Sequence, residues 1–481
     1  MIRDTFFRVL ERQFPYSFTS EQEEAAHKLC DFILTPDSHG VFILRGYAGT
    51  GKTTLISSLV RVLLRLQRGV VLMAPTGRAA KVFSSKSSHP AYTIHKVIYR
   101  QKRRNDRTAG FTLNHNKYRN TLFIIDEASM ISNQSSPHSI FGSGCLMDDL
   151  FEFIYSGNGC RALFVGDTAQ LPPVGEMDGP ALQAECVAEY GLHVTSLELT
   201  EVMRQGNESG ILYNATQLRK QLAEGCTTSI PTIRFSGFND LRPMPGGELI
   251  EALEQSYDHY GTDQTIVITR SNKRAVIYNQ GIRATIFGRE GELTKGDVVM
   301  IARNNYFWTE KLQAEVGEAN PLPMDFIANG DIAVVSHIKN FLELYGLHFA
   351  DVTLTFPDYD DLEIDVRVIL DALQSETPAL PQELGEQLYQ GVMEDLADYP
   401  TKKQRLEHLG MDLNYNAIQI KYAYAVTCHK AQGGQWEHVF VDQGWMPNDG
   451  ADTNYYRWLY TAFTRAESLL DLVNWPSGKS S

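Results

Sequence analysis

Short apolar runs alternate with stretches of helical periodicity along much of this chain. In the segment from Ser17 to about Gln205, five runs rich in Val, Ile, Leu and Phe each have the length of one buried strand. They lie near Val41–Arg45, Val70–Ala74, Leu122–Asp126, Leu163–Gly166 and Val194–Leu197. Because strands that alternate with helices form parallel sheets, this segment predicts an α/β domain.

A second parallel sheet is predicted in the C-terminal half. Its apolar runs are Thr265–Thr269, Ile420–Val426, Val439–Asp442 and Leu469–Val473. Three further β-rich runs fall inside this region, separated by Gly and Asp turn residues: Thr294–Ile301, Phe326–Val335 and Ala350–Phe356. Their short spacing predicts a small β-barrel inserted into the second domain. The stretch from Asp371 to Gly410 is predicted to be helical and acidic.

Length and composition bound the class of protein. A chain of 481 residues is too long for one core and predicts three or four domains. No apolar run approaches the length of a membrane span, and the N-terminus lacks the pattern of a signal peptide. Six cysteines lie far apart without a C-x-x-C pair, which favours reduced thiols in the cytoplasm over zinc or disulfides.

Charge is unevenly distributed. The net charge is −14, yet residues 96–119 carry eight bases and one acid, so this segment is +7 and the remainder −21. Conversely, residues 351–365 carry six acids and no base. A concentrated basic segment on an acidic body suits a protein that grips a polyanion in one channel. A solvated loop is the structural alternative. The turn-rich centre of Gln101–Leu113 predicts a hairpin.

The first apolar run leads into a glycine-rich octapeptide, GYAGTGKT, at residues 46–53, and a helical pattern follows from Leu55 to Leu66. Strand, G-x-x-x-x-G-K-[ST] and helix together form a phosphate-binding P-loop, whose backbone N–H groups surround a di- or triphosphate. Lys52 would reach the β- and γ-phosphates, and the Thr53 hydroxyl would hold Mg²⁺. The predicted nucleotide-binding residues are Gly46, Ala48, Gly49, Thr50, Gly51, Lys52, Thr53 and Thr54.

An acidic pair follows another predicted strand. The run Thr121–Ile125 ends in Asp126 and Glu127. A buried parallel strand delivers side chains at its carboxyl end, where α/β proteins bind ligands. Asp126 would hold Mg²⁺, and Glu127 would activate the attacking water as general base. Acids at a helix N-terminus are also favoured for structural reasons, but the P-loop upstream favours the hydrolytic interpretation.

Two more polar residues follow predicted strands, and a third lies in a motif farther along the chain. Gln170 lies in the sequence GDTAQ, where a side chain could sense a γ-phosphate. Arg204 follows the apolar run His193–Leu197, and Arg465 lies in the sequence YTAFTRAE. An arginine presented to a γ-phosphate neutralises the charge of the transition state. Isolated arginines more often form surface ion pairs, so these assignments depend on the surrounding motifs.

Taken in order, these motifs resemble those of the superfamily 1B DNA helicases of the RecD and Dda type, over nearly the whole chain. Ten segments occur in the family order. They are TSEQ ending at Gln22, GYAGTGKTT, APTGRAA from Ala74, TIHK ending at Lys96, IIDEAS, GDTAQLPPV, VMRQ ending at Gln205, ITRSN ending at Asn272, AVTCHKAQGG ending at Gly434, and YTAFTRAE.

The resemblance implies two RecA-like P-loop motor domains of α/β class, with ATP in the cleft between them. Gln22 would read adenine, and Gly434 and Gln435 would lie beside the nucleotide. The implied catalytic residues are Lys52, Glu127, Gln170, Arg204 and Arg465, with Thr53 and Asp126 as Mg²⁺ ligands. The residues implied to contact single-stranded DNA are Pro75, Thr76, His95, Lys96, Asn272, Thr427, His429 and Lys430. Such side chains can contact phosphate and sugar without reading base edges.

The resemblance also divides the chain into domains. Motor domain 1A is expected at residues 1–85 and 121–205, with a basic hairpin insertion, 1B, at 86–120. Motor domain 2A is expected at 206–293 and 416–481, and an SH3-type β-barrel with an acidic helical excursion, 2B, at 294–415. In the family such a hairpin is the pin that splits the duplex. Tyr99, Phe111 or Tyr118 would stack on the first separated base pair.

One position departs from the family pattern. After Gln432 and Gly433 the family usually has a glutamate, whereas here Gly434 is followed by Gln435. Glutamine can still hydrogen-bond a hydroxyl but adds no charge, so we expect the ribose contact to differ.

The expected activity is ATP- and Mg²⁺-dependent movement from 5′ to 3′ on single-stranded DNA, with unwinding of duplex DNA in repair, recombination or replication. The direction comes from the resemblance alone. The expected partners are single-stranded DNA and its junctions with duplex, bound by a monomer in the cytoplasm near the nucleoid, without a membrane. One alternative is an RNA helicase of the same superfamily, because few single-strand contacts detect a 2′-hydroxyl. Another is a motor subunit that works only within a repair complex, for which the acidic segment would be the partner surface.

Overall fold

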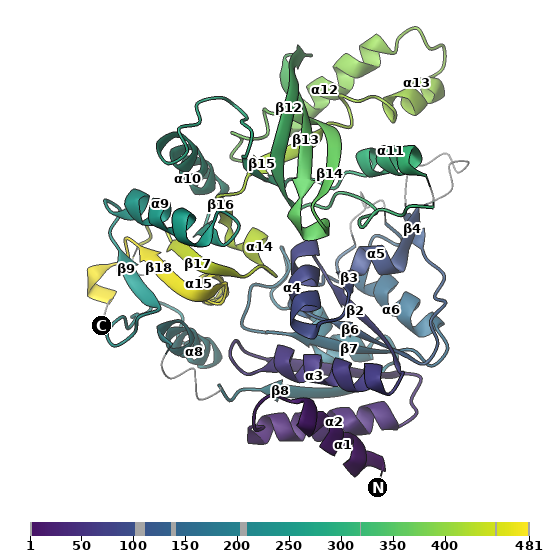
Figure 1. Cartoon of the computed structure of the whole chain (residues 1–481), viewed down its shortest axis with the longest axis vertical. Coiled ribbons are helices and arrows are strands. Elements are labelled where there is room, and N and C mark those ends of the chain that lie inside the picture. The colour runs from purple at the N-terminus through teal and green to yellow at the C-terminus, as the bar shows by residue number, and fades with distance from the viewer. Residues whose placement is uncertain are drawn as a thin grey trace.

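The computed structural model describes residues 2–101, 111–135, 141–202, 209–317, 319–447 and 450–479. Two parallel β-sheets and a closed β-barrel form the frame of this part of the chain. In Figure 1 the N-terminal sheet lies below, the C-terminal sheet lies to the left, and the barrel stands above both. No helix in the described ranges combines the length and apolar character needed to cross a membrane.

The N-terminal sheet has, within the described residues, six parallel strands in the order β3-β2-β6-β7-β1-β8. Their bounds are β1 Gly40–Gly46, β2 Gly69–Ala74, β3 Ala91–Thr93, β6 Thr121–Ile125, β7 Arg161–Gly166 and β8 His193–Leu199. The pleat sends Val41 and Ile43 into one buried cluster, and Phe42 and Leu44 into another on the opposite face. Both faces are therefore covered, as a parallel sheet requires.

Helices lie on both faces of this sheet (Figure 1). They are α1 Ile2–Gln13, α2 Ser20–Leu34, α3 Lys52–Arg65, α4 Gly77–Ser87, α5 Ile94–Ile98, α6 Leu146–Ser156 and α7 Ala184–Ala188. Helices α3 and α4 each begin directly after the carboxyl end of a strand. This connection brings the first residues of both helices to the edge of the sheet where ligands bind in α/β folds.

The C-terminal sheet is also parallel, with the strand order β16-β10-β17-β18-β9 in the residues described. The strands are β9 Leu241–Met244, β10 Thr265–Thr269, β16 Ala425–Thr427, β17 Trp436–Asp442 and β18 Ala466–Val473. The helices are α8 Gly210–Ala223, α9 Leu249–Tyr260, α10 Asn272–Thr285, α14 Cys428–Ala431 and α15 Thr453–Phe463. One hydrophobic cluster is shared by this sheet and the barrel, so the two are packed together.

The barrel closes in the order β11-β12-β13-β14-β15. Its strands are β11 Val298–Ile301, β12 Ile332–Leu344, β13 Leu347–Phe356, β14 Leu362–Ile369 and β15 Ile418–Tyr422, and α11 Phe307–Val316 lies beside it. Three of the six acids in residues 351–365 form ion pairs with bases, and one of them is Asp358, which lies 3.2 Å from Lys81. Asp351 accepts from Arg367 at 2.7 Å, and Asp365 lies 2.5 Å from Lys339. Such cross-strand pairs stabilise the surface of an antiparallel sheet.

The acidic excursion folds into α12 Gln382–Asp395 and α13 Lys402–Leu409, at the end of the barrel farthest from the motor sheets (Figure 1). Leu388 of α12 and Leu409 of α13 are buried against Leu347 and Phe349 of the barrel. The excursion therefore has its own apolar contact with β13. This position separates the acidic residues of both helices from the ends of the motor strands, whereas Glu376, which precedes α12, lies 3.5 Å from Lys273 at the start of α10.

The transition from barrel to second motor domain differs from the sequence prediction of one strand over 420–426. Ile420 of β15 pairs with Ile301 in the barrel, whereas Val426 of β16 pairs with Ile268 in the motor sheet. Only residues 423 and 424 connect the two strands. The barrel therefore extends past the expected boundary at residue 415, because a single apolar run serves two sheets.

The basic insertion contains an antiparallel hairpin base, formed by β4 Tyr99–Gln101 and β5 Phe111–Leu113. The expected insertion began at residue 86, but β3 and α5 belong to the N-terminal sheet and its covering helices. The hairpin strands therefore occupy a shorter segment than expected. The predicted turn with Lys102, Arg103, Arg104 and Arg107 lies outside the described residues.

Candidate functional site

The predicted P-loop connects β1 to α3. Gly49 and Gly51 have φ angles of 78° and 79°, in the left-handed region that glycine adopts without strain. The Lys52 ammonium donates to the carbonyl oxygens of Gly46 at 2.6 Å and Tyr47 at 2.8 Å. The loop therefore curves around its own lysine at the N-terminus of α3. Thr53 and Thr54 occupy the next two positions of that helix.

Gln22 supports the P-loop from the second helix. Thr19 caps α2 and forms a reciprocal capping box with Gln22. The Gln22 side chain is 1% exposed, and its Nε2 donates to the Thr50 carbonyl oxygen at 2.8 Å. The residue implied to read adenine is thus anchored directly to the loop that would hold the phosphates.

Asp126 and Glu127 lie at the carboxyl end of β6, as the sequence predicts. Asp126 Oδ1 accepts the Glu127 N–H at 2.9 Å, and Glu127 has a φ of 51°, which is uncommon for a non-glycine residue. Burial, followed by the neighbouring Glu127 charge, raises the pKa of Asp126 to about 6, while Lys52 opposes this shift. The turn therefore presents two acids beside the P-loop lysine, and strain at Glu127 marks a candidate functional position.

Tyr460 of α15 joins the two motor domains at the P-loop. Its hydroxyl donates to Asp167 Oδ2 at 2.7 Å and accepts the Ala48 N–H at 2.9 Å. Burial raises the pKa of the Asp167 carboxyl and, together with that carboxyl, raises the pKa of Tyr460 well above its ordinary value. A buried hydrogen-bonded link therefore connects the first and second motor domains beside the nucleotide loop.

Arg465 extends from the end of α15 towards the first motor domain. Its Nε donates to the Thr461 carbonyl oxygen at 3.1 Å, and its Nη1 donates to that of Gly434 at 3.2 Å. Nη1 also lies 3.9 Å from Glu127 Oε1, and Arg465 is only 3% exposed. The guanidinium is thus held within the second domain while facing the acid of the first.

Gln170 lies in the same interface. Its side chain is buried, and Oε1 has no hydrogen-bond partner among the described residues. The next residue, Leu171, is held by the second domain, because its N–H donates to Thr461 Oγ1 at 2.9 Å and its carbonyl accepts from Gln432 at 2.7 Å. A buried acceptor without a partner calls for an explanation, and a ligand or water at this position would supply one.

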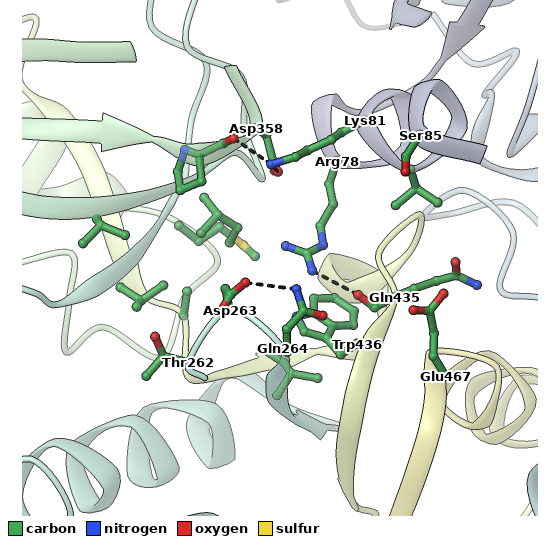
Figure 2. Close-up of a pocket in the computed structure, with 18 of the residues that line it drawn as sticks. Arg78, Lys81, Ser85, Thr262, Asp263, Gln264, Asp358, Gln435, Trp436 and Glu467 are labelled. Carbon is green, nitrogen blue, oxygen red and sulfur yellow. Dashed lines mark hydrogen bonds and ion pairs between the residues drawn. The ribbon is translucent and has the colours of Figure 1, made fainter. Parts of the chain in front are cut away.

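Gly434 and Gln435 face different surroundings. The Gly434 carbonyl contacts Arg465 beside the acidic pair. The Gln435 side chain instead accepts from Lys86, and its carbonyl accepts from Arg78 Nη2 at 3.0 Å. Figure 2 shows Gln435 and Arg78 in a junction pocket of about 320 Å³, between α4, the barrel and the amino ends of the C-terminal strands. The predicted ribose contact of Gln435 stays a prediction.

Arg204 lies outside the described residues. The segment leading to it is anchored by Glu21, whose carboxylate accepts the Thr200 hydroxyl at 2.5 Å and the Glu201 N–H at 2.8 Å. Glu21 adjoins Gln22 in the sequence. The start of α2 therefore holds both the P-loop and the chain that continues to Arg204.

Residues implied to bind single-stranded DNA lie at the carboxyl ends of strands in both sheets. Pro75 and Thr76 follow β2, and Thr76 caps α4 by accepting the Ala79 N–H at 3.2 Å. Thr427 ends β16, and Asn272 begins α10 just beyond β10. Because parallel strands present their carboxyl ends at one edge, both motor sheets carry these polar residues on the ligand-binding edge.

Three of these residues share a small groove between the second motor domain and the barrel. Asn272, Thr427 and Lys430 line it together with Lys421. Burial lowers the pKa of Lys430 to about 8, and burial with the Lys430 charge lowers that of Lys421 to about 8. Two amines held near each other attract an anion. His429 is exposed on the short helix α14 beside this groove.

His95 has a different environment from the other implied DNA contacts. It belongs to an aromatic cluster of His95, Tyr99, Phe111, Phe141, Tyr306 and Phe326. Its ring lies 4.7 Å from Phe141 and 6.0 Å from Phe326, and burial lowers its pKa to about 4. Lys96 donates to the Pro323 carbonyl in the same region. Both residues therefore connect the base of the hairpin to residues 323–326, which lie between α11 and β12.

This cluster also corrects the expectation for the hairpin aromatics. Tyr99 and Phe111 are 6% and 9% exposed, and the Tyr99 hydroxyl donates to Asp149 at 2.6 Å. In this conformation neither ring is free to stack on a base pair. Tyr118, the third aromatic considered, is 42% exposed but lies outside the two hairpin strands.

Comparison with known proteins links both halves of the chain to helicases. Residues 17–230 match the family described as "AAA domain", and residues 422–473 match the family described as "UvrD-like helicase C-terminal domain". The ATP-dependent RecD2 DNA helicase of Deinococcus radiodurans is 27% identical over 66% of this chain and 40% of its own length. The ATP-dependent DNA helicase dda of Enterobacteria phage T4 is 24% identical over 59% of this chain and 60% of its own.

The chain thus spans less than two thirds of the length of either helicase. A solved structure of Pif1 helicase from Bacteroides, in complex with ADP-AlF3 and single-stranded DNA, covers 95% of this chain and 92% of its own, with 15% identity and a TM-score of 0.45. The two family matches fall on the two motor domains, in the order that the motifs require. Together, the two family matches and the two helicase relatives support a superfamily 1B helicase, a class of ATP-driven DNA helicases.

The residues of this candidate site fit a magnesium nucleotide. The glycines of the P-loop leave its backbone open to phosphate, and Lys52 supplies a cation at the helix N-terminus. Asp126 and Glu127 lie close enough to Lys52 for its charge to affect the Asp126 pKa. The buried Gln170 oxygen adds an acceptor in the same interface. This donor and acceptor set suits a phosphate, a hard cation and a water.

Sequence reasoning gave no role to four residues that organise the helicase site. Asp167 and Tyr460 lie inside motifs quoted for the resemblance, so their polar character within GDTAQ and YTAFTRAE was a usable signal. Arg78 also lies in a quoted motif, APTGRAA. Glu21 had no signal beyond its position beside Gln22, because an acid in the first turn of a helix is favoured in any case.

Proposed function

We propose that this helicase couples ATP hydrolysis to movement from 5′ to 3′ along single-stranded DNA and separates the duplex ahead of it. The supporting observation is the distance of 3.9 Å between Arg465 of the second motor domain and Glu127 of the first. A catalytic site completed by two domains is active only when they approach each other. Nucleotide state and domain spacing are therefore linked, as a translocating motor requires.

In this proposal each residue of the interface has a distinct task. Lys52 binds the terminal phosphates, while Thr53 and Asp126 hold Mg²⁺, which neutralises phosphate charge when bound. Glu127 accepts a proton from the attacking water, and Gln170 orients that water. Arg465 stabilises the charge that develops on the transferred phosphoryl group. Arg204 would add a second cation from the segment that Glu21 anchors.

Movement on DNA follows from the position of the strand ends. Thr76 belongs to the first motor domain, and Asn272 and Thr427 belong to the second. If both sets grip one strand, closure and opening of the nucleotide cleft change their spacing along it. Differential affinity of the two domains for DNA in each state then gives net movement. The proposed setting is DNA repair, recombination or replication.

The decisive experiment is strand separation on two matched duplexes, one with a 5′ single-stranded tail and one with a 3′ tail, in the presence of ATP and Mg²⁺. We expect opening of the 5′-tailed duplex alone. Lys52→Ala is the control, because loss of the phosphate-binding ammonium should abolish turnover while leaving the exposed DNA face intact. Opening of the 3′-tailed duplex alone would overturn the direction.

Two further results would redirect the assignment. Equal stimulation of ATP hydrolysis by RNA and DNA oligomers would favour an RNA-capable helicase. DNA-stimulated ATP hydrolysis without opening of either duplex would favour a motor subunit that needs a partner. In that case the exposed acidic face of α12 is the surface at which to search for the partner.

A further inference from the structure

Trp445 is the exception among the tryptophans. All five tryptophans of the chain lie within the described residues. Trp445 is 87% exposed, whereas none of the other four exceeds 9%. Leaving so large an apolar ring in water forgoes the burial that stabilises the other four. An exposed indole of this kind calls for a partner that the chain itself does not supply.

The position of Trp445 places it on the edge of the sheet that carries the implied DNA contacts. Thr269, the last residue of β10, pairs with Thr427 on one side and with Asp442 on the other. Three parallel strands therefore end at the same level. Asn272 lies three residues beyond Thr269, and Trp445 lies three residues beyond Asp442. The indole thus follows β17, the strand next to the one that leads to Asn272.

Basic side chains hold the loop that carries this indole. Arg274 donates to Asp442 Oδ2 through Nε at 2.9 Å and packs against Gly444, which has a φ of 71°. Arg270 Nη1 lies 3.0 Å from the Met446 sulfur. The residues on either side of Trp445 thereby contact Arg270, in the β10–α10 connection, and Arg274, in the first turn of α10.

Arg270 and Lys273 give the surroundings of Trp445 a positive character. The Asp442 carboxylate is 2% exposed and is covered by Arg274, so its charge is matched. Arg270 is exposed, and the Lys273 side chain is 66% exposed, although it lies 3.5 Å from Glu376. A single aromatic ring flanked by cations is the composition of a surface that stacks bases and binds phosphates.

We propose that Trp445 stacks on one base of single-stranded DNA, with Arg270 and Lys273 contacting the adjoining phosphates. The inference rests on the proposed function, since it requires DNA to follow the strand ends of the second motor domain. Stacking accepts any base, because every base has a π-face, and so it suits a motor that moves regardless of sequence. A protein partner fits less well, because Arg270 and Lys273, two exposed side chains at this edge of the sheet, are charged.

The exposure pattern makes this inference accessible to fluorescence. Acrylamide quenches exposed indoles first, so quenching of the native helicase reports chiefly on Trp445. We expect oligo(dT) to protect the fluorescence from acrylamide. Trp445→Ala should weaken oligo(dT) binding by roughly 5- to 150-fold, while Trp445→Phe, which keeps a flat ring, should retain most of the affinity. The salt dependence should be unchanged in both, because no ionic contact is removed.

A matched control and a matched ligand sharpen the test. Ile277→Ala removes another exposed apolar side chain, 58% exposed on α10 of the same domain, and should bind oligo(dT) like the wild type. An oligomer of equal length and charge that lacks bases should bind Trp445→Ala and the wild type equally.

The possible results separate this inference from the proposed function. Equal affinity of Trp445→Ala and the wild type for oligo(dT), with no protection of the fluorescence, would overturn the stacking role and leave the helicase assignment in place. A loss of equal size on the base-free oligomer would also overturn it, because the contact would then be to the backbone. Failure of the wild type to bind any single strand would remove both the proposed function and this inference.

Discussion

The guanidinium of Arg78 lies over the ring of Trp436, 4.4 Å from its centre, and joins α4 of the first motor domain to β17 of the second. Figure 2 shows the two side chains meeting in the junction pocket. Arg78 follows the implied DNA contact Thr76 by two residues, and the Trp436 N–H donates to the Arg465 carbonyl at 3.0 Å. A short series of contacts therefore links the DNA face to the arginine of the nucleotide site.

We expect Arg78→Lys to uncouple DNA binding from hydrolysis. Lysine keeps the charge but lacks the planar group that stacks on Trp436 and reaches the Gln435 carbonyl. DNA-stimulated turnover should fall by roughly 5- to 30-fold, which matches a partly buried cation–π contact of about 1–2 kcal/mol. ATP hydrolysis without DNA and the affinity for single-stranded DNA should change little. Steady-state ATPase assays across a DNA titration would measure all three quantities.

Lys81→Ala is the matched control for Arg78. It removes a neighbouring cation of α4 whose ion pair with Asp358 is half-exposed on the lysine side. The change leaves the contact of Arg78 with Trp436 in place, so stimulation by DNA should persist. An equal loss in both variants, or a parallel loss of basal hydrolysis in Arg78→Lys, would contradict a coupling role for Arg78.

Glu127→Gln should separate nucleotide binding from turnover. The amide has the shape of the carboxylate but cannot accept the proton of the attacking water, so turnover should fall by about 10²- to 10⁴-fold. The affinity for ATP should stay near that of the wild type, because the P-loop is unchanged. Equilibrium binding of a fluorescent ATP analogue and single-turnover hydrolysis would test this. Near-normal hydrolysis would remove Glu127 from the role of base.

The local parts of this site were predictable because each depends on a short run of sequence. A strand followed by a glycine-rich turn fixes Lys52, and a buried strand ending in two acids fixes Asp126 and Glu127. The contacts between domains were not predictable in this way. The pairing of Tyr460 with Ala48 and Asp167 joins residues about 300 to 400 positions apart, and no spacing rule specifies it.

Two other differences have identifiable physical causes. The run over 420–426 looks like one strand because no glycine or proline marks the change of sheet at residues 423 and 424. Strand β14 was overlooked although its residues alternate between apolar and charged, from Leu362 to Ile369, as a half-buried strand should. The surroundings of His95 depend on rings from two distant segments, Phe141 and Phe326, and its immediate sequence gives no sign of them.

Phe326→Leu should weaken unwinding more than ATP hydrolysis. The ring centre of Phe326 lies 5.0 Å from that of Tyr306 and 6.2 Å from that of Phe111. Phe326 therefore helps to hold the hairpin base against the segment between α11 and β12. Leucine keeps apolar volume but loses the ring contacts, at a cost of about 1–2 kcal/mol. A loosened hairpin would transmit less force to the duplex. Phe341→Leu, at a 54% exposed site on β12, is the control.

Unwinding and DNA-stimulated hydrolysis measured on one tailed duplex would compare the two variants. Unwinding should fall several-fold for Phe326→Leu and stay unchanged for Phe341→Leu. Equal loss of unwinding and hydrolysis would show that the aromatic cluster supports the motor as a whole.

The contact between barrel and first motor domain contains a titrating group, Asp331, which is 5% exposed. Its carboxylate accepts the Ala328 N–H at 2.7 Å and the Tyr359 hydroxyl at 3.1 Å, and a Cβ on Gly77 at the start of α4 would lie 2.4 Å from that hydroxyl. Burial raises the pKa of Asp331 from 3.8 to about 7, against the lowering effect of these hydrogen bonds. The folded protein therefore holds a proton here that the unfolded chain releases.

The sign of the pH dependence follows from that difference. The stabilisation from the bound proton is fully present below pH 4 and is lost as the pH rises through about 7. Asp331→Asn does not titrate and keeps one acceptor for Tyr359, so it should gain about 1–3 kcal/mol in unfolding free energy over the wild type at pH 8.5. At pH 5 this gain should shrink towards zero. Urea unfolding at both pH values, with Asp361→Asn at an exposed position as a control, would measure it. A gain equal at both pH values would show that the Asp331 charge is not the cause.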